Sequence, residues 1–197
     1  MVESSPSRPR NAAATRQAIL TSAREAFVRS GYDGAGVREI AAGAVVTAML
    51  VNRYFGSKEK LFAEVLADIF GGPRVLTEAL MRSSSGPRDL ATAVVDMTAT
   101  DAPALDGFII MTRSMSNPRA TEIGREQIEA HHQASVAAGL VGPHAAERAG
   151  MVLAVVSGFQ TMRQAVGVST LAKADREILI TLLEPIFRGL IQGQPAT

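Results

Sequence analysis

The sequence predicts an all-α protein. Aromatic residues make up only 5% of the chain, and few segments alternate between apolar and polar residues with the period of two that marks a strand. Apolar residues instead recur every three or four positions, and glycine, proline or serine separates the periodic segments. We therefore expect about nine helices joined by short loops.

Length and cysteine content limit the class of protein. A chain of 197 residues, 47% of them hydrophobic, can form one large domain or two small ones with a buried core. The absence of cysteine excludes disulfides, thiolate nucleophiles, iron–sulfur clusters and cysteine-bearing zinc sites, and favours the cytoplasm. The longest apolar run, residues 149–159, is too short for a bilayer, so we expect no membrane partner.

The first helix is predicted over residues 12–30. Ile19, Ala23, Ala26 and Phe27 form one apolar stripe on it, and Gly31 is placed to end it. Residues 1–11 contain arginine but no apolar segment of the kind found in signal peptides. We expect them to form a flexible, weakly basic arm.

Two short helices and one longer helix are predicted next. Residues 37–44 form the first short helix, and Thr47 is a suitable N-cap for the second, which ends near Phe55. Ser57 is placed to cap a longer helix that ends at about Phe70, because two glycines and a proline follow at residues 71–73.

The spacing of the two short helices is typical of a helix-turn-helix. Val51 and Phe55 share one face of the second helix, so burial of that face points the opposite face outward. Asn52 on the outward face can read an adenine edge, and Arg53 can reach guanine or phosphate. Lys58 and the backbone N–H groups at the start of the next helix can hold a phosphate.

The charge distribution supports a nucleic-acid partner for the N-terminal part. Residues 1–63 carry nine Lys or Arg and five acids, whereas the remaining residues carry eleven and fourteen. A basic N-terminal part joined to a mildly acidic body indicates that only the former faces a polyanion.

The stretch VREIAAGAVVTAMLVNRYFGSKEKLF, residues 37–62, resembles the DNA-binding head of the TetR family of bacterial transcriptional repressors. The preceding RQAILTSAREAFVRSGYDG is similar to the first helix of that family. The resemblance implies a homodimer in which three-helix heads, residues 12–57, bind a palindromic double-stranded DNA operator. Bodies of residues 58–197 would dimerise and bind a small, mostly apolar effector that releases the DNA. The residues expected at the DNA are Thr47, Ala48, Met49, Leu50, Asn52, Arg53, Tyr54, Lys58, Arg38 and Arg16.

The chain departs from the family pattern at three positions of this motif. The family usually has glycine where Val45 stands, in the turn between the paired helices. A β-branched residue with positive φ costs about 1–2 kcal/mol, so we expect the turn to shift and to use Gly43. Asn52 replaces a usual aromatic residue and Leu50 a small polar one, which implies a different operator sequence.

The last two helices are predicted to form the dimer interface. Residues 145–166 are apolar almost all round, and residues 178–191 carry apolar side chains on two faces. A helix that is apolar on two sides must be buried on two sides, and a second copy of the chain can supply the second cover. The predicted interface residues are Val152, Val155, Val156, Leu179, Leu183, Ile186 and Phe187.

An effector pocket is predicted in the body, because flexible methionines and phenylalanines offer adaptable apolar surface and a histidine and an arginine can orient polar groups. The residues proposed for it are Phe62, Leu66, Met97, Phe108, Met111, Met115, His131, Phe159, Met162 and Arg163.

The sequence contains no recognisable catalytic or metal site, so we predict that the protein is not an enzyme and needs no cofactor or metal. His131 and His132 point about 100° apart on a helix, and a di-iron bundle needs more than the single Glu-x-x-His pair that Glu129 begins. Walker, nucleophile-elbow and dinucleotide motifs are missing. Two alternatives stay open: a DNA-binding regulator without a small ligand, and a helical enzyme.

Overall fold

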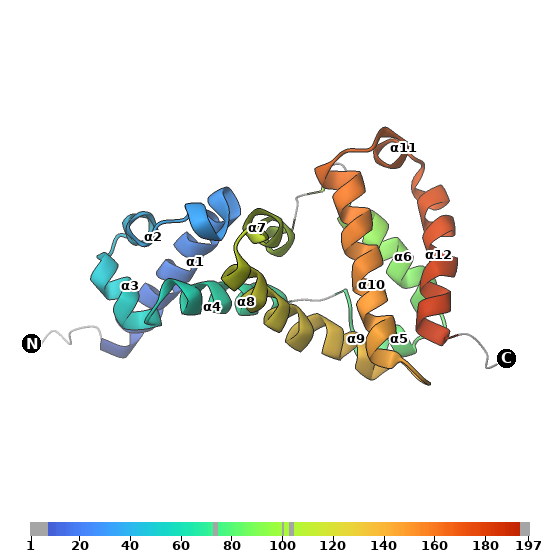
Figure 1. Cartoon of the computed structure of the whole chain (residues 1–197), viewed down its shortest axis with the longest axis horizontal. Helices are drawn as coiled ribbons and strands as arrows, with labels where there is room; N and C mark the ends of the chain where they lie inside the picture. The colour runs from blue at the N-terminus through green and yellow to red at the C-terminus, as the bar shows by residue number, and fades with distance from the viewer. Residues whose placement is uncertain (1–7, 73–74, 100, 103–104, 194–197) are drawn as a thin grey trace, which may run out of the picture. The chain divides into compact units, whose positions relative to one another are not determined.

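The computed structural model describes residues 8–72, 75–99, 101–102 and 105–193, and every regular element in them is helical (Figure 1). The helices with seven or more residues are α1 (Arg8–Gly34), α2 (Val37–Gly43), α3 (Ala48–Phe55), α4 (Lys58–Gly71), α6 (Gly86–Met97), α7 (Asp106–Ser114), α8 (Pro118–Ile128), α10 (Ala145–Gln160) and α12 (Arg176–Gln192). Three shorter helices are α5 (Glu78–Arg82), α9 (Ala134–Gly139) and α11 (Ser169–Ala172), and two π-helical segments are η1 (Glu129–Gln133) and η2 (Thr161–Ala165). The predicted all-α class is confirmed.

Element boundaries agree with the glycine, proline and serine positions of the sequence with three exceptions. Helix α1 continues past its predicted end at Gly31 to Gly34, although Gly31 itself has a non-helical backbone. Helix α1 already begins at Arg8, so residues 8–11 of the predicted arm are helical, and residues 1–7 lie outside the described part. The long helix predicted over residues 145–166 is α10 followed by the π-helical segment η2. None of the helices in the described residues has the length and apolar character needed to cross a bilayer.

The chain divides into two compact units. Unit 1 comprises the described residues up to 69 together with residues 106–126, and unit 2 comprises the described residues of 70–105 and of 127–197. The predicted head, residues 12–57, lies within unit 1. The same unit also takes most of α4, all of α7 and most of α8, which come from the predicted body.

The core of unit 1 forms around α1. The predicted stripe of Ile19, Ala23, Ala26 and Phe27 is at most 1% exposed. Phe27 meets Phe62 of α4 edge to face, with ring centroids 5.0 Å apart, a favourable arrangement of aromatic rings. Helices α1 and α4 are therefore fixed to each other by their largest side chains.

Helix α7 packs closely against the C-terminal end of α1. Gly31 has φ 64°, and a Cβ atom at this position would lie 2.5 Å from the carbonyl oxygen of Arg113. The Arg113 guanidinium donates a hydrogen bond to the carbonyl of Arg29 at 2.7 Å, and the buried Ser114 hydroxyl accepts one from the N–H of Tyr32 at 2.9 Å. Only glycine meets both the backbone conformation and the close approach.

Unit 2 has a separate core between α6, α10 and α12, which lie side by side in Figure 1. Its fully buried members include Leu90 and Val94 of α6, Val152 of α10, and Ile180 and Phe187 of α12. Apart from Phe187 its buried members are aliphatic or methionine, so this core depends mainly on packing complementarity between three helices.

Replacement of Gly31 by alanine tests the packing of α7 on α1. We expect Gly31→Ala to lower the free energy of unfolding by about 2–3 kcal/mol, because alanine is strained at positive φ and its Cβ displaces the Arg113 carbonyl. Urea unfolding followed by circular dichroism measures the change. Gly150→Ala in α10 is the control, since a Cβ there meets nothing within 4 Å. Equal stability of Gly31→Ala and the native protein would contradict this account.

Candidate nucleic-acid interface

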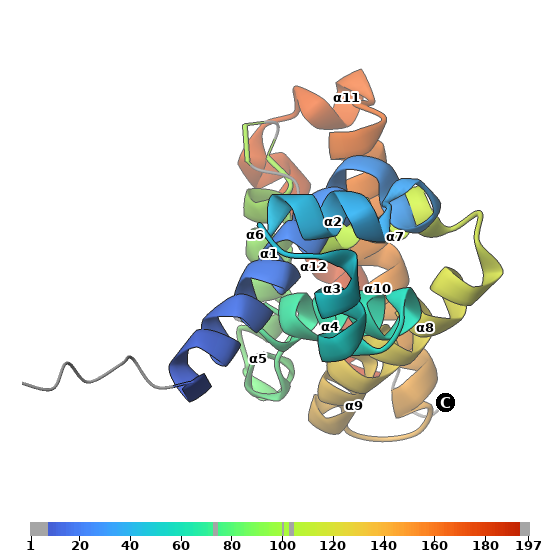
Figure 2. The same ribbon diagram turned by 90° about the vertical axis from the view of Figure 1, so that its left-hand side faces the viewer.

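Helix α3 is held by its cap and by its apolar face. The Thr47 hydroxyl accepts a hydrogen bond from the N–H of Leu50 at 3.2 Å, as the predicted N-cap requires. Val51 and Phe55 are 2% and 4% exposed, so the predicted buried face is confirmed. Figure 2 looks onto α2, α3 and the start of α4.

The turn between α2 and α3 is not shifted, and the expectation that Gly43 supplies its left-handed residue is wrong. Val45 itself has φ 55°. The N–H of Val46 donates to the carbonyl of Ala41 at 2.9 Å and the N–H of Val45 to that of Ala42 at 3.1 Å, which is the Schellman pattern of a helix C-terminus. This pattern requires a left-handed residue at position 45, whatever its side chain.

Gly43 serves a different purpose. The Ser22 hydroxyl of α1 donates to the carbonyl of Ile40 at 2.8 Å, and a Cβ at Gly43 would overlap its oxygen. The glycine therefore lets α2 approach α1 closely enough for this buried hydrogen bond. The sequence signal was a glycine inside a helical pattern, which indicates close packing as often as a turn.

The outer face of α3 is open to solvent. Met49, Asn52 and Arg53 are exposed, whereas Ala48, Leu50 and Tyr54 are half-buried. The orientation predicted from helical spacing is therefore confirmed by burial. The contacts of these side chains with DNA remain predictions.

Some of the cationic side chains of unit 1 form ion pairs with carboxylates, and others do not. Arg16 pairs with Glu64 and lies over the Phe55 ring at 5.0 Å, while Arg24 pairs with Asp106 at 2.6 Å and Arg29 pairs with Glu39. Among the described residues no ion pair is formed by Arg38, Arg53, Lys58 or Lys60. These four cations belong to α2, α3 and the start of α4. Arg16, predicted to contact DNA, is already engaged by a carboxylate.

Lys58 is oriented by an aromatic ring. Its ammonium lies 4.5 Å from the centroid of the Tyr32 ring, a cation–π contact that leaves the charge unneutralised. Burial raises the pKa of the Tyr32 phenol, and the Glu59 carboxylate raises it further. The Ser57 hydroxyl accepts from the N–H of Lys60 at 3.2 Å, which confirms the predicted cap of α4.

The ten predicted effector residues divide between the two units. Phe62, Leu66, Phe108, Met111 and Met115 belong to unit 1, and Met97, His131, Phe159, Met162 and Arg163 belong to unit 2. Phe62 and Leu66 are fully buried in the core of unit 1, whereas Met115 is 67% exposed. No single compact unit therefore contains the whole set. Apolar composition alone does not distinguish a pocket wall from ordinary core.

Arg163 is a buried cation of unit 2. It is 6% exposed and donates from Nη1 to the carbonyl of Val95 at 2.5 Å and to the Thr98 hydroxyl at 3.2 Å. Burial lowers the pKa of its guanidinium, and its Nε finds no hydrogen-bond partner among the described residues. The hydrogen bond to Val95 satisfies a carbonyl in the last turn of α6, a structural use of arginine at a helix C-terminus.

The predicted dimer residues fall into two groups. Val152, Leu179 and Phe187 are at most 3% exposed, and Val156 and Leu183 are 6% exposed, within the chain's own core. Val155 is half-buried and Ile186 is 47% exposed. Only this second group offers appreciable surface to a second copy.

An exposed apolar stripe on α12 contains Ile186 and two residues, Ile178 and Leu182, that are absent from the predicted interface residues. Ile178 and Leu182 are 57% and 61% exposed and precede Ile186 at steps of four residues on α12, and Met151 of α10 is 54% exposed. The spacing of four, present in the sequence at residues 178, 182 and 186, was the signal that could have found the stripe.

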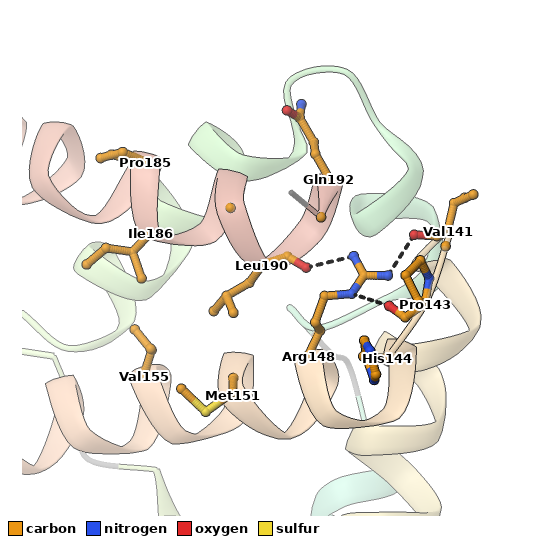
Figure 3. Close-up of a pocket in the computed structure, with 13 residues that line it drawn as sticks. Val141, Pro143, His144, Arg148, Met151, Val155, Pro185, Ile186, Leu190 and Gln192 are labelled. Atoms are coloured by element: carbon orange, nitrogen blue, oxygen red, sulfur yellow. Dashed lines mark hydrogen bonds between the residues drawn. The ribbon is translucent and has the colours of Figure 1, made fainter. Parts of the chain in front are cut away.

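A groove of about 830 Å³ opens between the adjoining ends of α10 and α12 (Figure 3). Met151, Val155 and Ile186 line it, and none of the ten predicted effector residues does. Arg148 closes one end of the groove by donating to the carbonyls of Leu190 at 3.1 Å and, from its other nitrogens, of the loop before α10. At this end of the groove, Arg148 therefore links the last turn of α12 to the loop before α10.

Comparison with known families identifies the class of protein. Residues 84–191 match the family described as tetracyclin repressor-like, C-terminal domain, and residues 19–65 match the bacterial regulatory proteins of the tetR family. The chain belongs to the TetR family of bacterial regulatory proteins, a family of DNA-binding transcriptional regulators. The predicted family is confirmed.

Similar individual proteins agree with this assignment. The HTH-type transcriptional repressor NicS of Pseudomonas putida is 38% identical over 63 residues, which span 32% of this chain and 30% of that relative. A TetR-family regulator from Streptomyces coelicolor has a similar fold, with TM-score 0.59, 23% identity and coverage of 91% of this chain and 95% of that chain. NalD, the secondary repressor of the MexAB-OprM multidrug efflux pump in Pseudomonas aeruginosa, gives TM-score 0.62, 23% identity and coverage of 91% and 98%.

A third similar structure contains a ligand. FadR from Bacillus subtilis, determined in complex with stearoyl-CoA, gives TM-score 0.60 at 16% identity and covers 91% of this chain and 99% of its own. At this level of identity the likeness shows the fold alone.

Replacement of Val45 by glycine tests the strain in the turn. Val45 is 91% exposed, so its removal loses little packing, while glycine relieves about 1–2 kcal/mol of left-handed strain. Part of this gain is lost, because glycine gives the unfolded chain more conformational entropy. We therefore expect Val45→Gly to raise the free energy of unfolding by about 0.5–1 kcal/mol. Chemical denaturation measures the change. Destabilisation by this substitution would show that the valine side chain supports the fold.

Proposed function

We propose that the protein is a ligand-responsive transcriptional repressor that binds a palindromic operator as a homodimer and is released by a small, mostly apolar effector. The observation that carries the DNA-binding part is the solvent-facing side of α3, which adjoins four cations without an ion pair in a helix-turn-helix of the TetR family. Family membership supports dimerisation and effector binding in general terms.

The DNA contacts are proposed to be of two kinds. Lys58, oriented by Tyr32 at the start of α4, neutralises a phosphate in any sequence. Asn52 on the exposed face of α3 reads an adenine edge, and Arg53 reads guanine or binds phosphate. Two heads related by a two-fold axis then engage half-sites about 34–36 Å apart, or a multiple of that distance.

Two alanine variants separate these contacts. We expect Lys58→Ala to weaken operator and random DNA alike and to lower the salt slope of log K by about one. Asn52→Ala should cost about 1–3 kcal/mol, mainly on the preferred sequence. Fluorescence anisotropy with both DNAs at several salt concentrations measures these effects. The proposed orientation of α3 is wrong if Lys58→Ala changes sequence preference while Asn52→Ala does not.

The dimer is proposed to form over the exposed stripe of α12. Ile178, Leu182 and Ile186 line one side of this helix, and Met151 and Val155 of α10 adjoin Ile186 at the groove. A second copy that brings the same stripe would bury these apolar side chains with two-fold symmetry. Leu183 is unsuitable for a test, because a charge there would be buried in the chain's own core.

Leu182→Glu tests this interface. We expect the variant to sediment as a monomer at micromolar concentration and to keep its helical circular dichroism, because Leu182 is 61% exposed in the single chain. Val166→Glu is the control, since Val166 is 63% exposed but lies outside the stripe. A native protein that is monomeric at this concentration, or a Leu182→Glu variant that remains dimeric, would overturn the proposed interface.

Release by an effector is proposed to act through α4. This helix begins with Lys58 in unit 1 and ends with Phe70 and Gly71, which belong to unit 2, so it is a continuous element shared by both units. A ligand that displaces it would change the position of the head relative to the fixed spacing of the major grooves. FadR, which shares this fold, was determined with stearoyl-CoA, and the acyl chain of that compound gives an example of a ligand with an apolar part.

A two-way titration tests the coupling. A compound that binds the protein should weaken operator binding by about 5- to 150-fold, and operator DNA should weaken that compound by the same factor. Stearoyl-CoA is a defined first probe, followed by other compounds that raise thermal stability. A ligand that saturates the protein without changing operator affinity is not an effector. Operator binding that no such compound alters would favour a regulator without a small ligand.

A further inference from the structure

Val45 has a strained backbone conformation, and packing of its side chain does not offset the cost of that strain. A β-branched residue at φ 55° costs about 1–2 kcal/mol relative to glycine. The side chain is 91% exposed, so it gains almost no packing within the chain. The Schellman turn fixes the backbone but places no demand on the side chain. A strained residue of this kind points to a use outside the stability of the single chain.

Met49 is a second exposed apolar residue, at the start of α3. It is 80% exposed and stands four residues after Val45 and four before Arg53, so Met49 and Arg53 lie one above the other on the outer face of the helix. Isolated exposed apolar residues are common and need no explanation. Met49, however, shares the outer face of α3, the face assigned to DNA, with the exposed Asn52 and Arg53, and Val45 lies in the turn that leads into this helix.

The surroundings of this apolar pair are complementary to nucleic acid. Residues 40–58 contain no aspartate or glutamate. The cations Arg53 and Lys58 within this segment form no ion pair in the described part of the chain. A protein or membrane partner could also cover these apolar residues, but Met49 shares the exposed face of α3 with Arg53, a cation without an ion pair among the described residues, and no acid lies in this segment, which fits a major groove best.

We propose that Val45 and Met49 contact the C5-methyl group of thymine in each operator half-site and select thymine at those positions. The thymine methyl is the apolar group that the base edges present in the major groove. Its contact with an apolar side chain gives specificity without a hydrogen bond, so it does not compete with the base contacts of Asn52 and Arg53. The inference rests on the proposed function, since it requires that α3 enters the major groove.

The test removes single methyl groups from the DNA. Selection from random duplexes with the full-length native protein first defines the operator. Each thymine pair related by the two-fold axis is then replaced by deoxyuridine, which differs from thymidine in the C5-methyl group alone. At the contacted position we expect binding to weaken about fourfold for each buried methyl group. Replacement at other positions leaves the affinity unchanged.

Protein variants assign the contacted methyl group to its side chain. In Met49→Ala, deoxyuridine at the Met49 position should carry no further penalty, while the penalty at a position contacted by Val45 is retained. Val45→Gly should show the converse, and should lose thymine preference while the protein becomes more stable. Leu105→Ala is the matched control, because it removes a 45%-exposed apolar side chain of unit 2 and should keep every deoxyuridine penalty of the native protein.

The outcomes distinguish this inference from the proposed function. If selection yields no preferred sequence, sequence-specific DNA binding fails and the inference fails with it. A defined operator whose thymines all tolerate deoxyuridine overturns the inference alone. Deoxyuridine penalties that are the same in Met49→Ala, Val45→Gly and the native protein also overturn it, because the methyl groups would then act through the DNA itself.

Discussion

The close packing of α7 on the C-terminal end of α1 is the contact on which the DNA-binding head depends. Gly31 permits it, because any side chain there would meet the carbonyl of Arg113. With α1 held at this end, its Ser22 hydroxyl fixes the carbonyl of Ile40 in α2, and the glycine at position 43 lets the two helices approach. The Schellman turn then carries α2 into α3. The exposed face of α3 is thus positioned by a series of short contacts between backbone and small side chains, which leave little free volume between the helices.

Local patterns predicted the elements of the head well. The cap at Thr47 and the buried pair Val51 and Phe55 depend only on residues a few positions apart, so helical spacing is sufficient to find them. Val45 could not be predicted in the same way. Its intrinsic preference opposes positive φ, but the hydrogen bonds that end α2 outweigh that preference. Ion pairing was equally inaccessible, since Glu64 and Asp106, the partners of Arg16 and Arg24, are 48 and 82 residues away.

In the body, apolar content indicated which helices need a second cover but not which residues face it. Leu179 and Leu182 are three residues apart in one helix and chemically identical, yet the first is 3% exposed and the second 61%. This difference in exposure comes from the positions of α6 and α10 relative to α12, and the amino-acid composition gives no information about those positions. The same limit applies to the predicted effector residues. A methionine or phenylalanine at helical spacing fits a packed core as well as a cavity wall, and here the candidates divide between two compact units.

Unit 1, which contains the head, is assembled from two separate stretches of chain, and this affects how the unit forms and how it can be exchanged. During synthesis α1, α2 and α3 emerge first. The surface around Gly31 is covered only when residues 106–126 have been made, and these follow α5 and α6 of the other unit. A fragment that stops after α4 would expose that surface. A chimaera that moves DNA recognition onto another body would therefore need two crossovers, so that α7 and the start of α8 travel with the helix they cover.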